Sequence, residues 1–154
     1  MDKAVQELLD LHAIKQVMIR YADRIDANDP EGAAACFAED GIGNYWGIYK
    51  GRSEIAARLT ELIKDYAVTS HHLSNENIQL AGDKATSMAY VYAFHRMIDS
   101  GEPMHYWGRW IDSFVRVDGE WFIAEREVIG IDLIFPGVKK RDSVKPRHPG
   151  YIER

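Results

Sequence analysis

The stretch ATSMAYVYAFHRMI, residues 85–98, is typical of a β-strand, in which successive side chains point to opposite faces of the sheet. Its side chains fall into two sets, one of Val91, Ala93 and His95 and the other of Tyr90, Tyr92 and Phe94. Both sets are largely apolar, so this strand is expected to be covered on both faces. The aromatic set would form an apolar patch on the outer face, and such a patch favours burial against a second copy of the chain.

Three more segments have the same period, at residues 71–80, 104–117 and 121–134. Turn signals separate the four strands at 81–83, 99–101 and 118–119. The last of these is Asp118-Gly119, a strong hairpin signal because both residues tolerate a positive φ. The second half of the chain therefore predicts a meander of four long antiparallel strands.

The first third of the chain has helical spacing instead. One stripe of a long first helix consists of Val5, Leu8, Leu11, Ile14, Met18, Tyr21 and Ile25. Asp29 and Pro30 suit the start of a short second helix at 30–38. A glycine-rich segment at 41–49 is expected to form a short strand or hairpin. Ser53 is the expected cap of a third helix, whose apolar positions are Ile55, Leu59, Leu62, Ile63 and Tyr66.

Helices followed by a strand meander indicate the α+β class. The three helices are the only candidates to cover one face of the sheet. A curved, mostly antiparallel sheet wrapped around the first helix gives a conical barrel with an open pocket, which is a natural small-molecule site. We expect one such domain over residues 1–135. Residues 136–154, with three prolines, are expected to be an extended C-terminal arm, either a free tail or a lid over the pocket.

Composition excludes several classes of protein. The 154 residues have a formal net charge of −5, which argues against nucleic-acid and anionic-membrane partners. A single cysteine, Cys36, excludes an internal disulfide framework. No apolar run is long enough for a membrane span, and charges interrupt the N-terminal apolar stretch, unlike a signal peptide. A cytoplasmic protein is the default expectation.

Several polar residues are not explained by the core pattern. Asp26 follows the helical stripe directly and is either a solvated turn residue or a site residue. His71 and His72 open a strand, so only one of them can point inward, and parity does not choose between them if a bulge follows. Each could equally be a strand-edge histidine bonded to backbone.

His95 and Arg126 lie within strands, where each has a structural alternative. His95 is either a satisfied core residue or a site residue. Arg126 keeps its charge when buried, and a salt bridge to a neighbouring strand is its plain alternative. Trp110 and Tyr106 are either core aromatics or pocket walls. The sequence contains no nucleotide-binding, hydrolase or metalloprotease motif, and the histidines have poor spacing for chelation, so no metal site is expected.

Taken together, the motifs resemble a SnoaL-like member of the nuclear-transport-factor-two-like superfamily over roughly residues 3 to 135. The resemblance rests on their order: RID at 24–26, CFAEDG at 36–41, YKG at 49–51, HHLSN at 71–75 and RVDGEW at 116–121. Within the superfamily the chain is most similar to a lyase branch containing scytalone dehydratase, hexachlorocyclohexane dehydrochlorinase and the bile-acid 7α-dehydratases. This branch implies a cone-shaped α+β fold, usually trimeric, that works without metal or organic cofactor.

The resemblance also implies roles for individual residues. The branch's Asp–His dyad falls on Asp26 and His72, and a second dehydratase histidine falls on His95. Dehydratase tyrosines fall on Tyr45 and Tyr21. The dehydrochlorinase's pocket arginine falls on Arg126.

The implied reaction is a cofactor-free elimination of the dehydratase type, with the Asp–His dyad as general base. The same groups also suit an isomerase, and the superfamily includes non-catalytic binding and association domains as well. The implied partners are a small hydrophobic molecule and further copies of this chain, as a trimer in preference to a dimer. The expected pocket walls favour a flat ring-containing substrate, and they are Trp46, Tyr106, Trp110 and Phe122.

Overall fold

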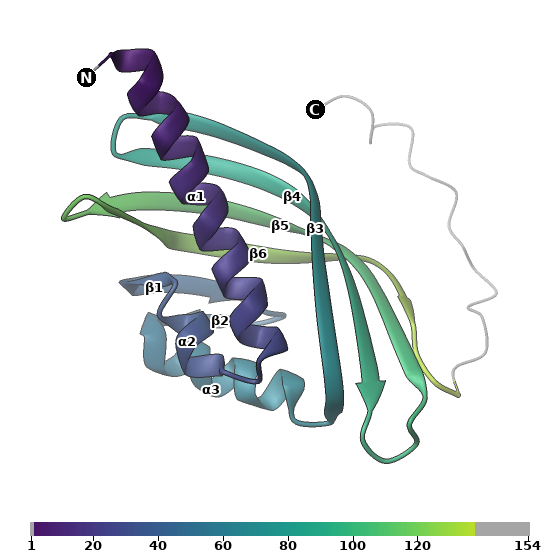
Figure 1. Ribbon diagram of the computed structural model, residues 1–154. Helices are drawn as coiled ribbons and strands as arrows, with labels where there is room; N and C mark the ends of the chain where they lie inside the picture. Colours follow the sequence, from purple (N-terminus) through teal and green to yellow (C-terminus); the bar gives the residue numbers. More distant parts are fainter. Residues whose placement is uncertain (1, 138–154) are drawn as a thin grey trace.

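A computed structural model describes residues 2–137 (Figure 1). Its elements are α1 (Lys3–Asp26), α2 (Pro30–Ala34), β1 (Phe37–Asn44), β2 (Ile48–Lys50), α3 (Gly51–Ile63), β3 (Tyr66–Ala81), β4 (Lys84–Met97), β5 (Pro103–Val117) and β6 (Glu120–Ile134). The strands form one sheet in the order β2-β1-β6-β5-β4-β3. Neighbouring strands are antiparallel except β1 and β6, which run parallel. The predicted α+β class is confirmed.

The sheet is strongly curved and α1 occupies its hollow side. Figure 1 shows the four long strands bending, with α1 along one face and with α2 and α3 grouped beside β1 and β2. Register shifts in the β3–β4 and β5–β6 pairs are consistent with this curvature, because a bulge bends its strand and increases its twist. The expected curved, mostly antiparallel sheet around a long N-terminal helix is therefore confirmed.

The apolar stripe of α1 is buried only from its third turn onward. The buried residues of the helix are Asp10, Ile14, Val17, Met18, Tyr21, Ala22 and Ile25. Val5 and Leu8, which the sequence placed in the stripe, are 46% and 67% exposed. Figure 1 shows the start of α1 reaching past the strands on which the rest of the helix packs, in agreement with the exposure of its first turns.

The short second helix ends four residues earlier than its spacing predicts. α2 stops at Ala34, and the chain enters β1 at Phe37. Phe37 is fully buried and pairs with Ile123 of β6. Burial of this ring on the parallel β1–β6 pair outweighs the helical propensity of the alanine-rich segment before it.

The predicted cap of the third helix is also wrong. Ser53 lies inside α3, and the N-cap is Lys50 with no side-chain capping bond. Instead the Lys50 backbone N–H donates to the Glu54 carboxylate at 2.8 Å, which satisfies a donor at the helix start.

A bulge in β3 decides which of its side chains point inward. The pairing with β4 shifts register within residues 74–77, where Asn75 has a φ of 53°. Leu73 and Ile78 are an odd number of positions apart, yet both pack against the core. Before the bulge, residues two positions apart share a face of β3. His71 therefore points inward with Leu73.

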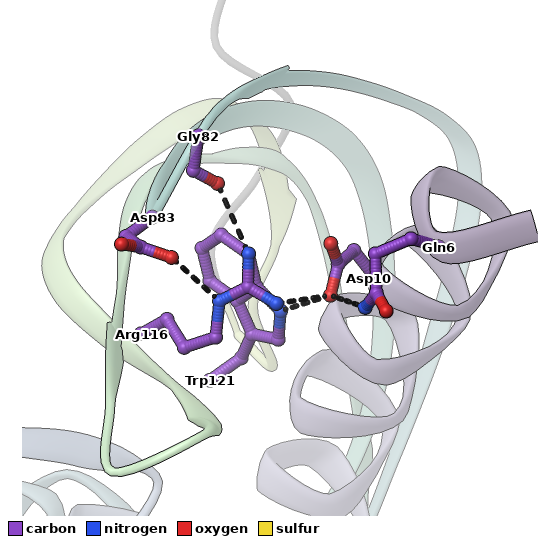
Figure 2. Close-up of polar contacts among 6 residues, drawn as sticks. All are labelled: Gln6, Asp10, Gly82, Asp83, Arg116 and Trp121. Carbon is purple, nitrogen blue, oxygen red and sulfur yellow. Dashed lines mark hydrogen bonds and ion pairs between the residues drawn. The ribbon is translucent and has the colours of Figure 1, made fainter. Parts of the chain in front are cut away.

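A polar clasp around Asp10 ties α1 to the far ends of the long strands. Asp10 Oδ1 accepts hydrogen bonds from Arg116 Nη1 at 2.7 Å and from Trp121 Nε1 at 3.1 Å. Arg116 also donates from Nε to Asp83 Oδ1 at 2.9 Å, at the β3–β4 turn. The whole clasp, drawn in Figure 2, consists of Gln6, Asp10, Gly82, Asp83, Arg116 and Trp121. It joins three chain segments through one mostly buried carboxylate.

The outer face of the sheet carries a cluster of aromatic and histidine rings. Tyr92 lies at its centre, with its hydroxyl 2.8 Å from His105 Nδ1 and its ring centroid 5.5 Å from that of Trp107. His72 and Phe94 extend the cluster through ring contacts with Tyr92 and His105 respectively. Trp107 is 37% exposed, so part of this aromatic surface faces solvent.

None of the helices within residues 2–137 is both long and apolar enough to span a bilayer. Of the arm predicted for residues 136–154, only Pro136 and Gly137 fall within the described residues. The lid hypothesis for that arm therefore lies outside the described structure.

We expect Asp10→Ala to lower the free energy of unfolding by about 1–3 kcal/mol, because the Arg116 and Trp121 donors lose a mostly buried acceptor. Thermal denaturation should show a midpoint lower by several degrees. Glu7→Ala is the control, since its ion pair with Lys3 is exposed and long at 3.7 Å. Equal midpoints for the two variants would contradict a structural role for the clasp.

Burial of the outer aromatic face against another copy of the chain stays a prediction. Light scattering at micromolar concentration should give a mass close to a multiple of the chain mass, with a trimer expected. Trp107→Asp should shift the protein toward monomer because it places a charge in the contact. Thr86→Asp is the control, since Thr86 lies on the same sheet face of β4 but away from the ring cluster. A monomeric parent protein would rule out this contact.

Candidate active site

A cavity of about 130 Å³ lies between the end of α1, α3 and the hollow side of the sheet. Most of its wall is apolar, with aliphatic side chains from α1, α3 and the long strands. Its lining residues with polar atoms on their rings are Tyr21, Tyr45, Tyr66, His71, His95, Trp46, Tyr106 and Trp110. Such a wall, apolar with a few convergent polar groups, is typical of a small-molecule site.

Asp26 and His71 form a close pair at the edge of this cavity. His71 Nδ1 lies 2.7 Å from Asp26 Oδ1, and the His71 backbone N–H donates to Oδ2 at 2.8 Å. The Thr69 hydroxyl donates to Oδ1 at 2.9 Å. Burial by itself would raise the pKa of Asp26, but the hydrogen bonds from His71 and Thr69 outweigh it and lower that pKa. The ionised carboxylate favours the tautomer with the proton on His71 Nδ1, which leaves Nε2 as a proton acceptor.

The sequence-based assignment of the dyad to His72 is wrong in geometry. His72 is exposed on the opposite face of β3, where its ring lies 5.7 Å from that of Tyr92. That assignment came from the family resemblance, because parity could not choose between the two histidines; the parity set by Leu73 on the near side of the bulge points His71 inward. His71 is the histidine that Asp26 contacts.

His95 lines the cavity from β4, beside His71. It is 8% exposed, and its ring centroid lies 5.4 Å from that of His71 and 4.5 Å from that of Tyr66. Nδ1 of His95 is buried with no hydrogen-bond partner among residues 2–137. Burial, with a smaller effect of His71, lowers the pKa of His95 to about 4. His95 is therefore a neutral imidazole at neutral pH.

Tyr21 and Tyr45 meet at the wall of the cavity. Their hydroxyl oxygens are 2.8 Å apart, and either can be the donor. Burial raises the pKa of both groups, and that of Tyr45 lies well above its usual value. Both hydroxyls are therefore protonated at neutral pH. One proton lies between the two oxygens, and the other is available to a ligand.

Arg126 lies behind the cavity wall rather than in it. Its guanidinium makes a bidentate ion pair with Asp112 at 2.8 and 2.7 Å, and both side chains are fully buried. Its Cζ lies 4.2 Å from the ring centroid of Tyr21 and 3.9 Å from that of Trp110. The salt bridge that the sequence left open as an alternative is therefore present. Burial opposes the charge of Arg126, but Asp112 outweighs that effect and raises the pKa.

Three of the four predicted aromatic walls contribute to the cavity. Trp110 and Tyr106 lie in its wall, and Trp46, 63% exposed, stands at its mouth with its ring 6.4 Å from that of Tyr106. Phe122 does not line it. The Phe122 ring contacts the Arg52 guanidinium at 5.5 Å instead, because its position pairs with the outward-facing Val115.

Sequence reasoning missed three contributors to the site. Tyr66 was placed in the third helix, but α3 ends at Ile63 and Tyr66 opens β3. Thr69 was overlooked because β3 begins five residues earlier than its alternation predicts. Asp112 carried a usable signal, since it alternates with Trp110 and Phe114 on the buried face of β5. A carboxylate in such an apolar set needs a cationic partner.

The family comparison agrees with this architecture. Residues 6–127 match the model of the SnoaL-like domain. The chain belongs to this family. An uncharacterized protein of Mycobacterium tuberculosis is 28% identical over 129 residues, which cover 80% of this chain and 86% of the relative.

Solved structures place the SnoaL-like domain in the nuclear-transport-factor-two-like superfamily. A Novosphingobium aromaticivorans protein, provisionally named a scytalone dehydratase, superposes with a TM-score of 0.81 at 27% identity, covering 94% of this chain and 99% of its own. A hexachlorocyclohexane dehydrochlorinase from Novosphingobium barchaimii gives a TM-score of 0.79 at 15% identity, covering 94% and 100%. The second likeness concerns the fold alone.

Few side chains of the cavity could bind a metal ion or transfer a proton. Within residues 2–137, no three His, Cys, Asp or Glu side chains are grouped as metal ligands. The acid–base groups that the cavity of this SnoaL-like domain does bring together are the Asp26–His71 pair and the neutral His95.

The lowered pKa of His95 predicts a specific loss of stability in acid. The unfolded chain takes up a proton on this histidine near pH 6.5, whereas the folded SnoaL-like domain does so only near pH 4. The free energy of unfolding should therefore fall as the pH drops from 6.5 to 4. Urea titrations at pH 7, 5.5 and 4 should show a smaller fall for His95→Gln than for the parent chain, with His12→Gln, on the exposed side of α1, as the control. Parallel curves for His95→Gln and parent would contradict a neutral buried His95.

Proposed function

We propose that this SnoaL-like domain is a cofactor-free lyase that eliminates water from a small ring-containing substrate, with His71 as the general base. The observation that carries the proposal is the 2.7 Å contact between Asp26 and His71 at the edge of an apolar cavity. Elimination needs a base for a C–H proton and groups that stabilise the charge left behind.

His71 Nε2 is the base because Nδ1 is held by Asp26. When Nε2 takes the proton, the imidazolium that forms is stabilised by the adjacent carboxylate. Proton transfer changes the net charge of the pair from −1 to zero, so the imidazolium forms with its counter-charge already in place in an apolar site. Asp26 orients the ring and does not itself take up the proton.

The electrons of the broken C–H bond pass to an adjacent carbonyl oxygen of the substrate. A buried hydroxyl of the Tyr21–Tyr45 pair donates a hydrogen bond to that oxygen as its negative charge develops. The hydroxyl stays protonated because burial raises its pKa. Trp110 and Arg126 hold the Tyr21 ring in place from behind.

The second half of the reaction expels the leaving hydroxyl. The enolate electrons form the C=C bond and the β-hydroxyl departs, taking the proton from His71 Nε2 to leave as water. The neutral His95, beside His71, positions this hydroxyl by hydrogen bonding. His71 returns to its neutral form, so the cycle balances without another reactant.

The comparisons support elimination over the alternatives. The solved relative at 27% identity has a dehydratase name. An isomerase of the ketosteroid type would use the same base but return the proton to another carbon. A binding-only pocket would have no need of the Asp26–His71 pair.

The test is a turnover screen with β-hydroxyketones of one to four rings, followed by the absorbance of the enone product. We expect His71→Asn to abolish turnover and Asp26→Asn to lower kcat by about 10²–10⁴-fold, since the histidine then loses its tautomer and orientation. His72→Asn is the matched control, because His72 is the adjacent residue but faces outward. Its kcat should equal that of the parent chain.

The same samples in D₂O separate the alternatives. Exchange of the substrate's α-proton without loss of water would indicate an isomerase. Binding without exchange or turnover in every substrate would indicate a binding domain. Loss of activity in His72→Asn with retention in His71→Asn would overturn the assignment of the base.

A further inference from the structure

Tyr106 rests flat on a pair of glycines at one wall of the cavity. Gly108 of β5 and Gly130 of β6 pair across the two strands. A Cβ on Gly108 would lie 2.2 Å from the Tyr106 hydroxyl oxygen, and a Cβ on Gly130 would lie 3.6 Å from the ring carbon Cε2. The two glycines therefore leave room for the Tyr106 ring, and a side chain at Gly108 would collide with its hydroxyl end.

The Tyr106 hydroxyl is a buried donor that the protein does not use. It has no hydrogen-bond partner among residues 2–137. Burial raises the pKa of Tyr106 to about 12, so the hydroxyl keeps its proton at neutral pH. Leaving such a group unsatisfied costs free energy, and a ligand oxygen that accepts its hydrogen bond would recover that cost.

Tyr106 and the proposed base stand on opposite sides of β4. His71 pairs with Ala93 of β4, and Ala93 pairs with Tyr106 of β5. Two strand spacings separate their backbones by about 10 Å. A ligand that lies across β4 in the cavity meets His71 at one end and the Tyr106 hydroxyl at the other.

The volume of the cavity limits the size of that ligand. The cavity holds about 130 Å³. An engineered apolar cavity of about 150 Å³ accommodates one benzene ring. A two-ring or four-ring compound would have to displace the surrounding side chains or remain outside the mouth at Trp46.

We infer that the substrate is a single-ring compound bearing a second oxygen, remote from the reacting C–H bond, that accepts a hydrogen bond from Tyr106. The inference rests on the proposed function, because the orientation of the ring assumes that His71 is the base. It narrows the flat ring-containing substrate expected from the sequence to a compound with one six-membered ring. Tyr106 acts here as a specificity-determining residue that selects oxygenated rings over hydrocarbon ones.

The test compares two probes that differ only in the remote oxygen, cyclohexane-1,4-dione and cyclohexanone. NMR titration of the parent chain should show the dione binding between about three- and tenfold tighter, the range expected for one hydrogen bond. Tyr106→Phe should abolish this preference and leave cyclohexanone affinity unchanged. Gly108→Ala should also abolish the preference, because its new methyl group displaces the tyrosine ring.

Tyr92→Phe is the matched control, since Tyr92 is on the outer sheet face and its loss should leave the dione preference intact. Thermal midpoints confirm that each variant is folded. A four-ring steroid ketone serves as the size probe and should cause no shifts at cavity residues. Equal affinity for the two single-ring probes in the parent chain, an intact preference in Tyr106→Phe, or binding of the steroid would each overturn the inference.

Failure of this inference and failure of the proposed function are distinguishable. His71→Asn should keep the dione preference while losing all turnover. If Tyr106→Phe keeps the preference but His71→Asn still abolishes turnover, the lyase stands and the substrate assignment falls. If His71→Asn retains turnover, the proposed base is wrong whatever Tyr106 does.

Discussion

The buried ion pair of Arg126 and Asp112 is the constraint on which the rest of the cone depends. Removing two charges from water is costly. The bidentate geometry of the pair, and the rings of Tyr21 and Trp110 that face the Arg126 guanidinium, offset that cost. The two charged residues are cross-strand neighbours, so their pairing also fixes the register between β5 and β6. Because Tyr21 belongs to α1, the same cluster holds the helix against the sheet and sets the wall of the cavity.

The Asp26–His71 contact holds α1 against the sheet at the other side of the cavity. It joins the C-terminal end of α1 to β3, at a place where the helix presents carbonyl oxygens and disfavours a carboxylate. Three hydrogen bonds from β3 compensate Asp26 for that position. The result is a carboxylate that stays ionised beside an apolar cavity and dictates the tautomer of one histidine. The packing of α1 against β3 and the acid–base chemistry that we propose therefore depend on the same two residues.

Periodicity predicted the fold class, the three helices and the four long strands, because each depends on a repeat that is visible in one chain. The face of each histidine was not predictable, since it depends on a bulge at Asn75 that alternation alone does not locate. Phe122 was misplaced for a related reason, because register shifts along the β5–β6 pair alter which side chains reach the cavity. Arg126 was predicted as a candidate site residue. Its position behind Trp110 depends on tertiary contacts, which residue spacing does not reveal.

The cavity meets a developing anion with neutral hydrogen-bond donors on its aromatic rings. Burial raises the pKa values of the cavity tyrosines and lowers that of His95, so these groups are neutral and weakly acidic at neutral pH. Neutral hydroxyls of high pKa stabilise an enolate less than a cation would. With the Arg126 charge already matched by Asp112, the reaction we propose for these groups relies on His71 both to take the C–H proton and to return it to the hydroxyl that leaves as water.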